Sequence, residues 1–234
     1  MKDHDGYGGV GATLVCDEPL TRPFLSQAYD RYLDGQDAAA FIREVSRVYT
    51  QGTLQRLAEH DSARIRRAAV LALGFLGDYE ANATLGKALQ DEDRLVRTIA
   101  EHGIRKVWTR VGDARQRRTL GVIIRLNESQ RFHAAIRRAN ELLRDAEWMA
   151  EAWNQRAIAH FSLKHYDDAI HDCRQALEIN PYHFAAAAGM GQAYLERGNP
   201  IAALESFRRA LRLNPDLEAV RVQVARLMRL IGET

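Results

Sequence analysis

Hydrophobic residues recur along most of the chain at intervals of three and four residues, with charged residues between them. One such segment is SARIRRAAVLALGFLGD, which begins at Ser62. Another lies near the C-terminus, where one apolar stripe consists of Val220, Val224, Leu227 and Ile231. Because this spacing places the apolar side chains on one face of a helix, the pattern predicts amphipathic helices joined by short polar turns.

Two adjacent segments of 34 residues, 150–183 and 184–217, align without a gap. Small residues recur at the eighth, twentieth and twenty-seventh positions of both segments. A proline, Pro181 or Pro215, stands near the end of each, where it stops the second helix because an interior proline loses a hydrogen bond and clashes with the preceding turn. A fixed period of this kind predicts stacked pairs of helices.

This pattern resembles the tetratricopeptide repeat, which places Trp, Gly or Ala, Tyr, Ala, Phe or Tyr, Ala and Pro at fixed positions. The matching residues of the first segment are Trp153, Ala157, Tyr166, Ala169, Ala176 and Pro181. Those of the second are Gly191, Tyr194, Ala203, Phe207, Ala210 and Pro215. The resemblance implies two antiparallel helices per repeat and a concave surface that binds a partner.

Two glycines, Gly189 and Gly191, lie inside a predicted helix of the second repeat. Each costs about 1 kcal/mol relative to alanine in such a position. We expect the missing side chains to let the two helices of the repeat approach closely, with Gly191 facing Ala203. Upstream, residues 116–149 keep the same period less well, and we interpret them as a degenerate first repeat.

A shorter period of 31 residues, from Arg66 to Arg97, precedes these repeats. Each unit carries an Asp, then Val or Ile followed by Arg, then Ala, a pattern that resembles the HEAT repeat in its short bacterial form, also found in phycobilisome lyases. In that family the arginine braces adjacent repeats against an aspartate of the turn. The resemblance therefore implies structural roles for Arg66 and Arg97.

Together these periods predict an all-α fold, an elongated α-solenoid of stacked antiparallel helix pairs. We predict an N-terminal arm, partly mobile, at 1–38 and HEAT-like repeats at 39–112. Tetratricopeptide repeats follow at 113–217, the first of them degenerate, and a capping helix closes the stack at 218–234.

The formal net charge is only +2, but basic residues gather in the middle of the chain. The resulting basic belt, residues 105–118, contains Arg105, Lys106, Arg110, Arg115, Arg117 and Arg118. Such side chains bind phosphates and carboxylates, so the belt supports an alternative function, the binding of nucleic acid or of an acidic partner. Few aromatic residues accompany the belt, which disfavours nucleic acid.

No catalytic constellation is recognisable, since no Ser, Cys or Lys lies beside a base. Among the eight histidines, His160, His165 and His171 lie close to Cys173 in the sequence. Their spacings of five and two do not place pairs on one helical face, so we predict no metal site and no cofactor. We expect a protein that is not an enzyme; the alternative is a subunit of a lyase-like enzyme.

The two cysteines, Cys16 and Cys173, are far apart and form no CxxC motif, which indicates a reducing compartment. The apolar stretch 8–16 is short, rich in glycine and preceded by aspartates, so it predicts neither a signal peptide nor a membrane span. We therefore expect a cytoplasmic protein without a membrane partner.

The resemblance to tetratricopeptide proteins implies a non-catalytic scaffold, because stacked repeats form a long concave surface that binds partners. In that family the first helix of each pair lines this surface. Carried over by position, the predicted partner-binding residues are Asn154, Ile158, Phe161, Gln192, Leu195, Arg226 and Arg229. Their side chains suit a protein or peptide with apolar anchors and acidic groups. The alternative for Ile158 and Phe161 is packing against neighbouring helices.

Chaperone-tail binders of this family use a clamp of lysine, asparagine and arginine. In this chain Gln155, Ala185 and Gly189 stand at the clamp positions. The sequence therefore disfavours that class of ligand.

Overall fold

The computed structural model describes residues 23–232, and the regular structure of this part is helical. Its N-terminal half consists of α1 (Phe24–Gly35), α2 (Ala38–Val48), α3 (Gln51–Leu57), α4 (Ala63–Leu76), the short 3-10 helix η1 (Tyr79–Ala81), α5 (Asn82–Ala88) and α6 (Arg94–Thr109). The C-terminal half consists of α7 (Ala114–Glu128), α8 (Phe132–Asp145), α9 (Ala150–Ser162), α10 (Tyr166–Ile179), α11 (Phe184–Glu196), α12 (Pro200–Leu213) and α13 (Glu218–Ile231).

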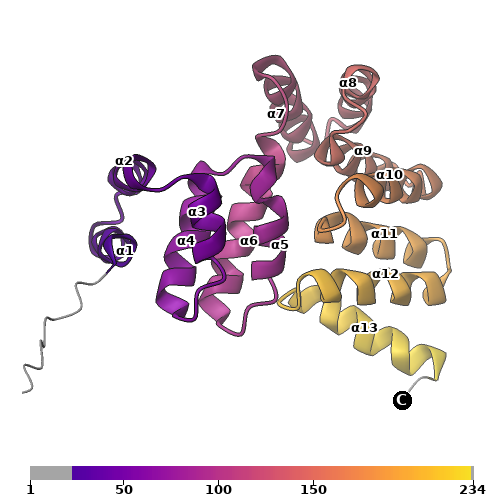
Figure 1. Cartoon of the computed structure of the whole chain (residues 1–234). Helices are drawn as coiled ribbons and strands as arrows, with labels where there is room; N and C mark the ends of the chain where they lie inside the picture. The colour runs from indigo at the N-terminus through magenta and orange to yellow at the C-terminus, as the bar shows by residue number, and fades with distance from the viewer. Residues whose placement is uncertain (1–22, 233–234) are drawn as a thin grey trace, which may run out of the picture.

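The predicted all-α solenoid of helix pairs is confirmed (Figure 1). Residues 1–22 of the predicted N-terminal arm, and 233–234 of the predicted capping helix, lie outside the described residues. None of the helices described is both long and apolar enough to span a membrane.

Several helices begin at a residue whose side chain caps them. The Asp93 carboxylate accepts a hydrogen bond from a backbone N–H of the first turn of α6, and Asp113 and Gln116 form a capping box at α7. Asn199 caps α12, and Pro200 occupies its first position, where its fixed φ suits the helix. These local contacts mark where the three helices begin.

The closest approach of α11 and α12 occurs at Gly191. A Cβ atom added there would lie 2.6 Å from the Phe207 ring, so this position requires glycine. The atoms nearest to Gly191 are those of the Phe207 ring, so the missing side chain makes room for Phe207. Ala203, the residue that we expected opposite Gly191, is fully buried one turn before Phe207. A Cβ atom at Gly189 would meet Cys173 Sγ at 3.5 Å, an ordinary contact.

In the N-terminal half, glycines likewise allow a close approach of two helices where α4 crosses α6. A Cβ atom added to Gly74 would lie 2.9 Å from the Cα atom of Gly103. Two glycines facing each other therefore let these helix backbones touch, which stacks the second helices of neighbouring pairs tightly.

The predicted structural role of Arg66 is confirmed. Its guanidinium donates hydrogen bonds to both carboxylate oxygens of Asp91, at 2.7 and 2.9 Å, and to the carbonyls of His60 and Asp61. Arg66 is buried, and the hydrogen bonds that it donates to Asp91 hold its pKa above the ordinary value. The arginine thus ties its own turn to the turn of the next pair.

Arg97 makes the same type of contact, but its partner is distant in the sequence. Its guanidinium donates to both oxygens of Asp216, at 2.8 and 3.2 Å, in the turn between α12 and α13. Close by, the Gln90 amide donates to the carbonyl of Arg212 at 2.8 Å. The turn before α13 therefore takes the place that a further pair of the N-terminal half would occupy.

The expected elongated stack is consequently wrong, because the C-terminal half folds back against α5 and α6 (Figure 1). Phe184 belongs to the hydrophobic core of the N-terminal half, and Tyr182 and Leu217 pack against that core. The Tyr182 ring lies directly over Gly86, where any side chain would overlap it. The chain thus forms two stacks lying side by side rather than one extended rod.

The seam between α11 and α12 gives a matched pair of substitutions. Gly191→Ala should lower the free energy of unfolding by about 1–3 kcal/mol, because the added methyl group overlaps the Phe207 ring. Gly189→Ala should raise it by up to about 1 kcal/mol, because alanine favours the helix and the methyl group fits. Urea denaturation of both variants and the parent measures the difference, and equal effects would contradict this seam.

The contact between Arg97 and Asp216 should show both energetic coupling and pH dependence. Hydrogen bonds from Arg97 hold the pKa of Asp216 below its ordinary value, so the ion pair stabilises the fold above the unfolded pKa of about 3.9. Its contribution is lost as the pH falls from there through the lower folded pKa. A double-mutant cycle of Arg97→Gln and Asp216→Asn should give a coupling of about 0.5–3 kcal/mol at pH 7.

The same cycle at acidic pH is the control. Urea denaturation below the unfolded pKa should show a smaller coupling between Arg97 and Asp216, because the carboxyl is then partly protonated in the folded protein. A coupling that is absent at pH 7, or independent of pH, would show that the turn before α13 does not depend on this ion pair.

Candidate functional site

A cavity of about 630 Å³ lies where α6 and α7 face α9, α10 and α11. Its apolar lining consists of Trp108, Ile124, Ala157, Ile158, Phe161, Ala169, Ala185 and Gly189. Its polar lining consists of Arg105, Thr109, Glu128, Glu151, Asn154, Gln155, Ser162, Cys173 and Gln192. The first helices of two pairs, α9 and α11, supply one wall, and α6 supplies another because the C-terminal half folds back.

Four of the seven predicted partner-binding residues meet in this cavity, namely Asn154, Ile158, Phe161 and Gln192. Ile158 is 41% exposed, so a large apolar side chain lies free there. Phe161 is half-buried and packs against the Tyr166 ring of α10, with the ring centroids 5.6 Å apart. The packing alternative thus holds in part for Phe161, whereas Ile158 remains open to a ligand.

The other three predicted residues do not line the cavity. Leu195 is half-buried and packs against the hydrophobic core to which α9 to α13 contribute. Arg226 and Arg229 are exposed on α13, where the Arg229 side chain donates to the carbonyl of Ala225 at 3.2 Å. That Arg226 and Arg229 bind a partner extending along α13 stays a prediction.

A different cation, Arg105 of α6, lines the cavity. Its guanidinium donates to the Glu101 carboxylate at 3.1 Å and lies 4.7 Å from the centre of the Phe184 ring. The sequence placed Arg105 in the basic belt and not in the binding surface, because the fold-back that brings α6 to α9 has no repeat signature.

The buried carboxylate of Glu151 lies at the centre of a hydrogen-bond network in the cavity lining. It accepts hydrogen bonds from His183 Nε2 at 2.9 Å, from the Gln155 amide at 2.7 Å and from the Asn154 amide at 3.3 Å. His183 Nδ1 accepts from the backbone N–H of Ala186, so the ring proton is on Nε2. Asn154 is therefore already committed to Glu151 through its amide nitrogen.

Burial alone would raise the pKa of Glu151, but these hydrogen bonds outweigh burial and hold the pKa below its ordinary value. The carboxylate is thus ionised at neutral pH and fully occupied by donors from its own chain. It stabilises the floor of the cavity rather than offering a free base for chemistry.

A chain of buried polar groups continues from His183 into the N-terminal half. The His183 ring stacks on Trp108 with the centroids 4.1 Å apart, and Trp108 Nε1 donates to Asn82 Oδ1 at 2.8 Å. The Asn82 amide in turn donates to Asn180 Oδ1 at 2.9 Å. The start of α5, the end of α6 and the turn between α10 and α11 are therefore joined beside the cavity.

Comparison with known proteins identifies the repeats. Residues 150–183 and 184–217 each match a family model for the tetratricopeptide repeat, and residues 28–105 match the model for HEAT repeats. The chain therefore contains HEAT repeats followed by tetratricopeptide repeats. The HEAT match begins at residue 28, inside the segment that we predicted to be the N-terminal arm. It therefore includes most of α1 and all of α2.

Relatives share the tetratricopeptide part. Small glutamine-rich tetratricopeptide repeat-containing protein 2 of Saccharomyces cerevisiae is 33% identical over 85 residues, which cover 36% of this chain and 25% of that protein. A TPR repeat-containing protein of Rhizobium etli is 29% identical over 121 residues, which cover 52% of this chain and 59% of that protein. The chain thus spans only part of the length of these relatives.

One solved structure supports the fold. It is the first TPR of Spaghetti (RPAP3) bound to an HSP90 peptide, with a TM-score of 0.50, 18% sequence identity and coverage of 52% of this chain and 97% of that one. At this identity the likeness concerns the fold of the tetratricopeptide repeats alone.

Most of the basic belt between the HEAT and tetratricopeptide repeats is engaged within the protein. The Arg110 guanidinium donates to the carbonyls of Gly74, Phe75 and Gly77 at the end of α4, and its burial lowers its pKa. Arg117 donates to a backbone carbonyl. The belt is therefore largely structural.

Two further belt cations face aromatic rings. Lys106 lies 4.9 Å from the centre of the Phe75 ring, and Arg105 covers Phe184. Arg115 and Arg118 are exposed on α7. Fewer of the six basic side chains of the belt are therefore available to bind phosphates than the sequence suggests.

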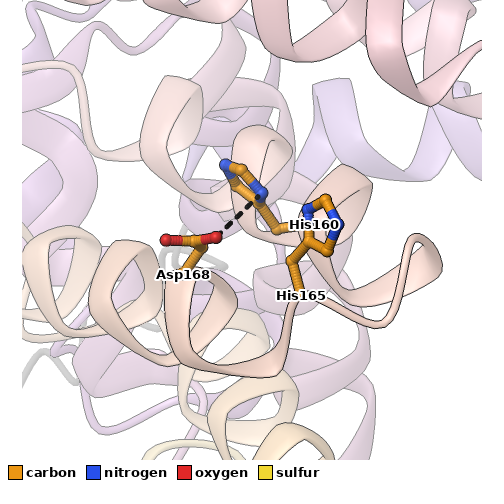
Figure 2. Close-up of side chains that lie close together, drawn as sticks. All are labelled: His160, His165 and Asp168. Carbon is orange, nitrogen blue, oxygen red and sulfur yellow. Dashed lines mark ion pairs between the residues drawn. The ribbon is translucent and has the colours of Figure 1, made fainter.

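The spacing argument against a metal site is wrong for one pair of histidines. Although five residues apart, His160 and His165 lie together at the turn between α9 and α10, with Asp168 beside them (Figure 2). Cys173 lies apart from them in the cavity wall, where burial raises the pKa of its thiol to about 12. The thiol is therefore protonated and a poor nucleophile.

The role of Glu151 can be tested against a second glutamate of the cavity. Glu151→Ala should lower the free energy of unfolding by about 2–3 kcal/mol, because it leaves the buried donors of His183 and Asn154 without an acceptor. Glu128→Ala, at an exposed position of the cavity rim, should change it by less than about 0.5 kcal/mol. Thermal and urea denaturation of the two variants would contradict the network if their effects were alike.

Proposed function

We propose that this protein is a non-catalytic adaptor that holds a partner protein or peptide by an apolar segment bound in the cavity. The observation that carries the proposal is the open apolar lining shared by α6, α7, α9 and α11, with the Ile158 side chain exposed in it. Concave sites lined mostly by apolar side chains with a few polar groups are typical of ligand binding. Stacked helical repeats commonly present such surfaces to partners.

The chemistry of the lining defines the partner segment. An apolar side chain would pack between Ile158 and Trp108, and the Gln192 amide would bond to the backbone of the segment. Acidic groups of the partner would pair with Arg105 at the cavity and with Arg226 and Arg229 on α13. Nucleic acid is the weaker candidate, because the chain uses much of its basic belt internally.

The mode of binding would differ from a carboxylate clamp. Gln155, Ala185 and Gly189, which stand at the clamp positions of chaperone-tail binders, all line the cavity and carry no positive charge. We therefore infer that apolar contacts supply most of the affinity. The interpretation of the protein as a bacterial adaptor of the reducing cytoplasm rests on its HEAT pattern and its unpaired cysteine Cys173.

Ile158→Asp tests the proposal, with Leu230→Asp as the matched control. Ile158 and Leu230 are both exposed, at 41% and 70%, so neither change should alter folding. Parallel affinity capture with quantitative mass spectrometry should find a protein that the parent and Leu230→Asp retain and that Ile158→Asp loses. Calorimetry with that purified partner should show at least about tenfold weaker binding to Ile158→Asp, about 1.4 kcal/mol.

The outcome that contradicts the cavity is equally specific. If every partner captured by the parent is retained by Ile158→Asp, with circular dichroism unchanged, the partner binds elsewhere. Loss of the partner from a variant with Arg115, Arg117 and Arg118 changed to glutamate would then place binding on the basic belt.

A further inference from the structure

Three side chains with metal-ligating atoms converge at the turn between α9 and α10. His160, His165 and Asp168 each offer one ligand atom, and these atoms lie within 4.8 Å of one another. His160 Nδ1 is 3.8 Å from Asp168 Oδ2, and Figure 2 shows the His165 ring beside this pair. None of the three lines the cavity, so the cluster is separate from the proposed partner site.

The backbone explains why histidines five residues apart meet. Lys164 adopts a left-handed conformation, with φ of 62°, and its N–H donates to the Phe161 carbonyl at 2.9 Å. The N–H of His165 donates to the carbonyl of His160, also at 2.9 Å. This pair of hydrogen bonds closes the end of α9 as a Schellman turn and fixes both histidine backbones.

Neighbouring repeats show that the turn does not require these side chains. The same backbone hydrogen bond joins Arg131 to Leu126 and Asn199 to Tyr194. At the positions of the three ligands, those turns carry Leu126, Arg131 and Ala134, and Tyr194, Asn199 and Ala202. The two histidines and the aspartate are therefore specific to this repeat and have no evident part in forming the turn.

The surroundings of His160 leave one nitrogen available. Nδ1 is buried and has no hydrogen-bond partner among the described residues, while Nε2 faces Asp172 Oδ2 at 4.0 Å. Arg156 holds that carboxylate by two hydrogen bonds, at 2.8 and 2.7 Å. With the proton on Nε2, Nδ1 keeps its lone pair 3.8 Å from Asp168 Oδ2, and a cation between the two atoms would be bound by both.

The second ring nitrogen of His160 also faces a carboxylate. Asp172 Oδ2 lies 4.0 Å from Nε2, while Asp168 Oδ2 lies 3.8 Å from Nδ1. A carboxylate that faces the second nitrogen of a ligating histidine is the usual outer partner in metal sites, and Asp172 stands in that place.

We propose that His160, His165 and Asp168 bind a divalent transition-metal ion of the zinc type. Two imidazole nitrogens and one carboxylate oxygen are ligands that Zn²⁺ accepts, at about 2.0–2.2 Å, and they leave a fourth position open to water or to a partner side chain. His165 and Asp168 are exposed, so the ion has access from solvent and both side chains have room to rotate inward to these distances.

Titration of the full chain, without an affinity tag, with Zn²⁺ in a calorimeter tests the proposal. The parent should bind one ion per chain, and His165→Asn and Asp168→Asn should each weaken binding at least about tenfold. His133→Asn, which removes another exposed histidine on α8, should bind as the parent does. Substituting Co²⁺ should give visible ligand-field absorption in the parent and in His133→Asn only.

Circular dichroism of all variants controls for folding, because the changed side chains are exposed. Loss of binding in His165→Asn with an unchanged melting curve in the absence of metal supports the site. A parent affinity no better than that of His165→Asn, including no binding by either, would overturn the proposal. So would an equal loss in His133→Asn.

Discussion

The contact between the turns of the tetratricopeptide repeats and helices α5 and α6 is the constraint on which the arrangement of this protein depends. Arg97 repeats the bond that Arg66 makes to Asp91, but with Asp216 from the far end of the chain. The HEAT stack is thus continued by a turn of another repeat family. Because of this contact α6 faces α9 and α11, and a cavity replaces what would otherwise be an open groove.

Buried polar groups give the contact its specificity. Trp108, Asn82 and Asn180 are buried and bond to one another, so sliding one half past the other would leave donors and acceptors unpaired. An unpaired buried group costs about 1–3 kcal/mol, which exceeds the net gain from a typical hydrogen bond. Apolar packing of Phe184 and Tyr182 supplies much of the attraction, whereas the polar groups select one register.

The sequence predicted what depends on neighbours in a repeat and missed what depends on distant parts of the chain. Periodicity reports the contacts that every repeat makes, so it located the helix pairs, and the resemblance to HEAT repeats implied the bracing role of Arg66. Asp216 looks like any turn aspartate, and nothing local marks it as the partner of Arg97. The same limit explains why Arg105, and not Arg226, lines the cavity. The helical spacing rule failed for His160 and His165 for a local reason, because the turn between α9 and α10 brings them together.

The cavity and the contact between the halves are thermodynamically linked. Trp108 belongs to a HEAT helix and Ile158 to a tetratricopeptide helix, and both line the same space. A ligand that touches both walls binds only while the two halves are in contact, so it stabilises that contact by its own binding free energy. By reciprocity, anything that favours the contact between the halves raises the affinity for that ligand. Trp108 takes part in both, because it lines the cavity and also belongs to the contact between the halves. There its indole N–H donates to Asn82 and its ring stacks on His183.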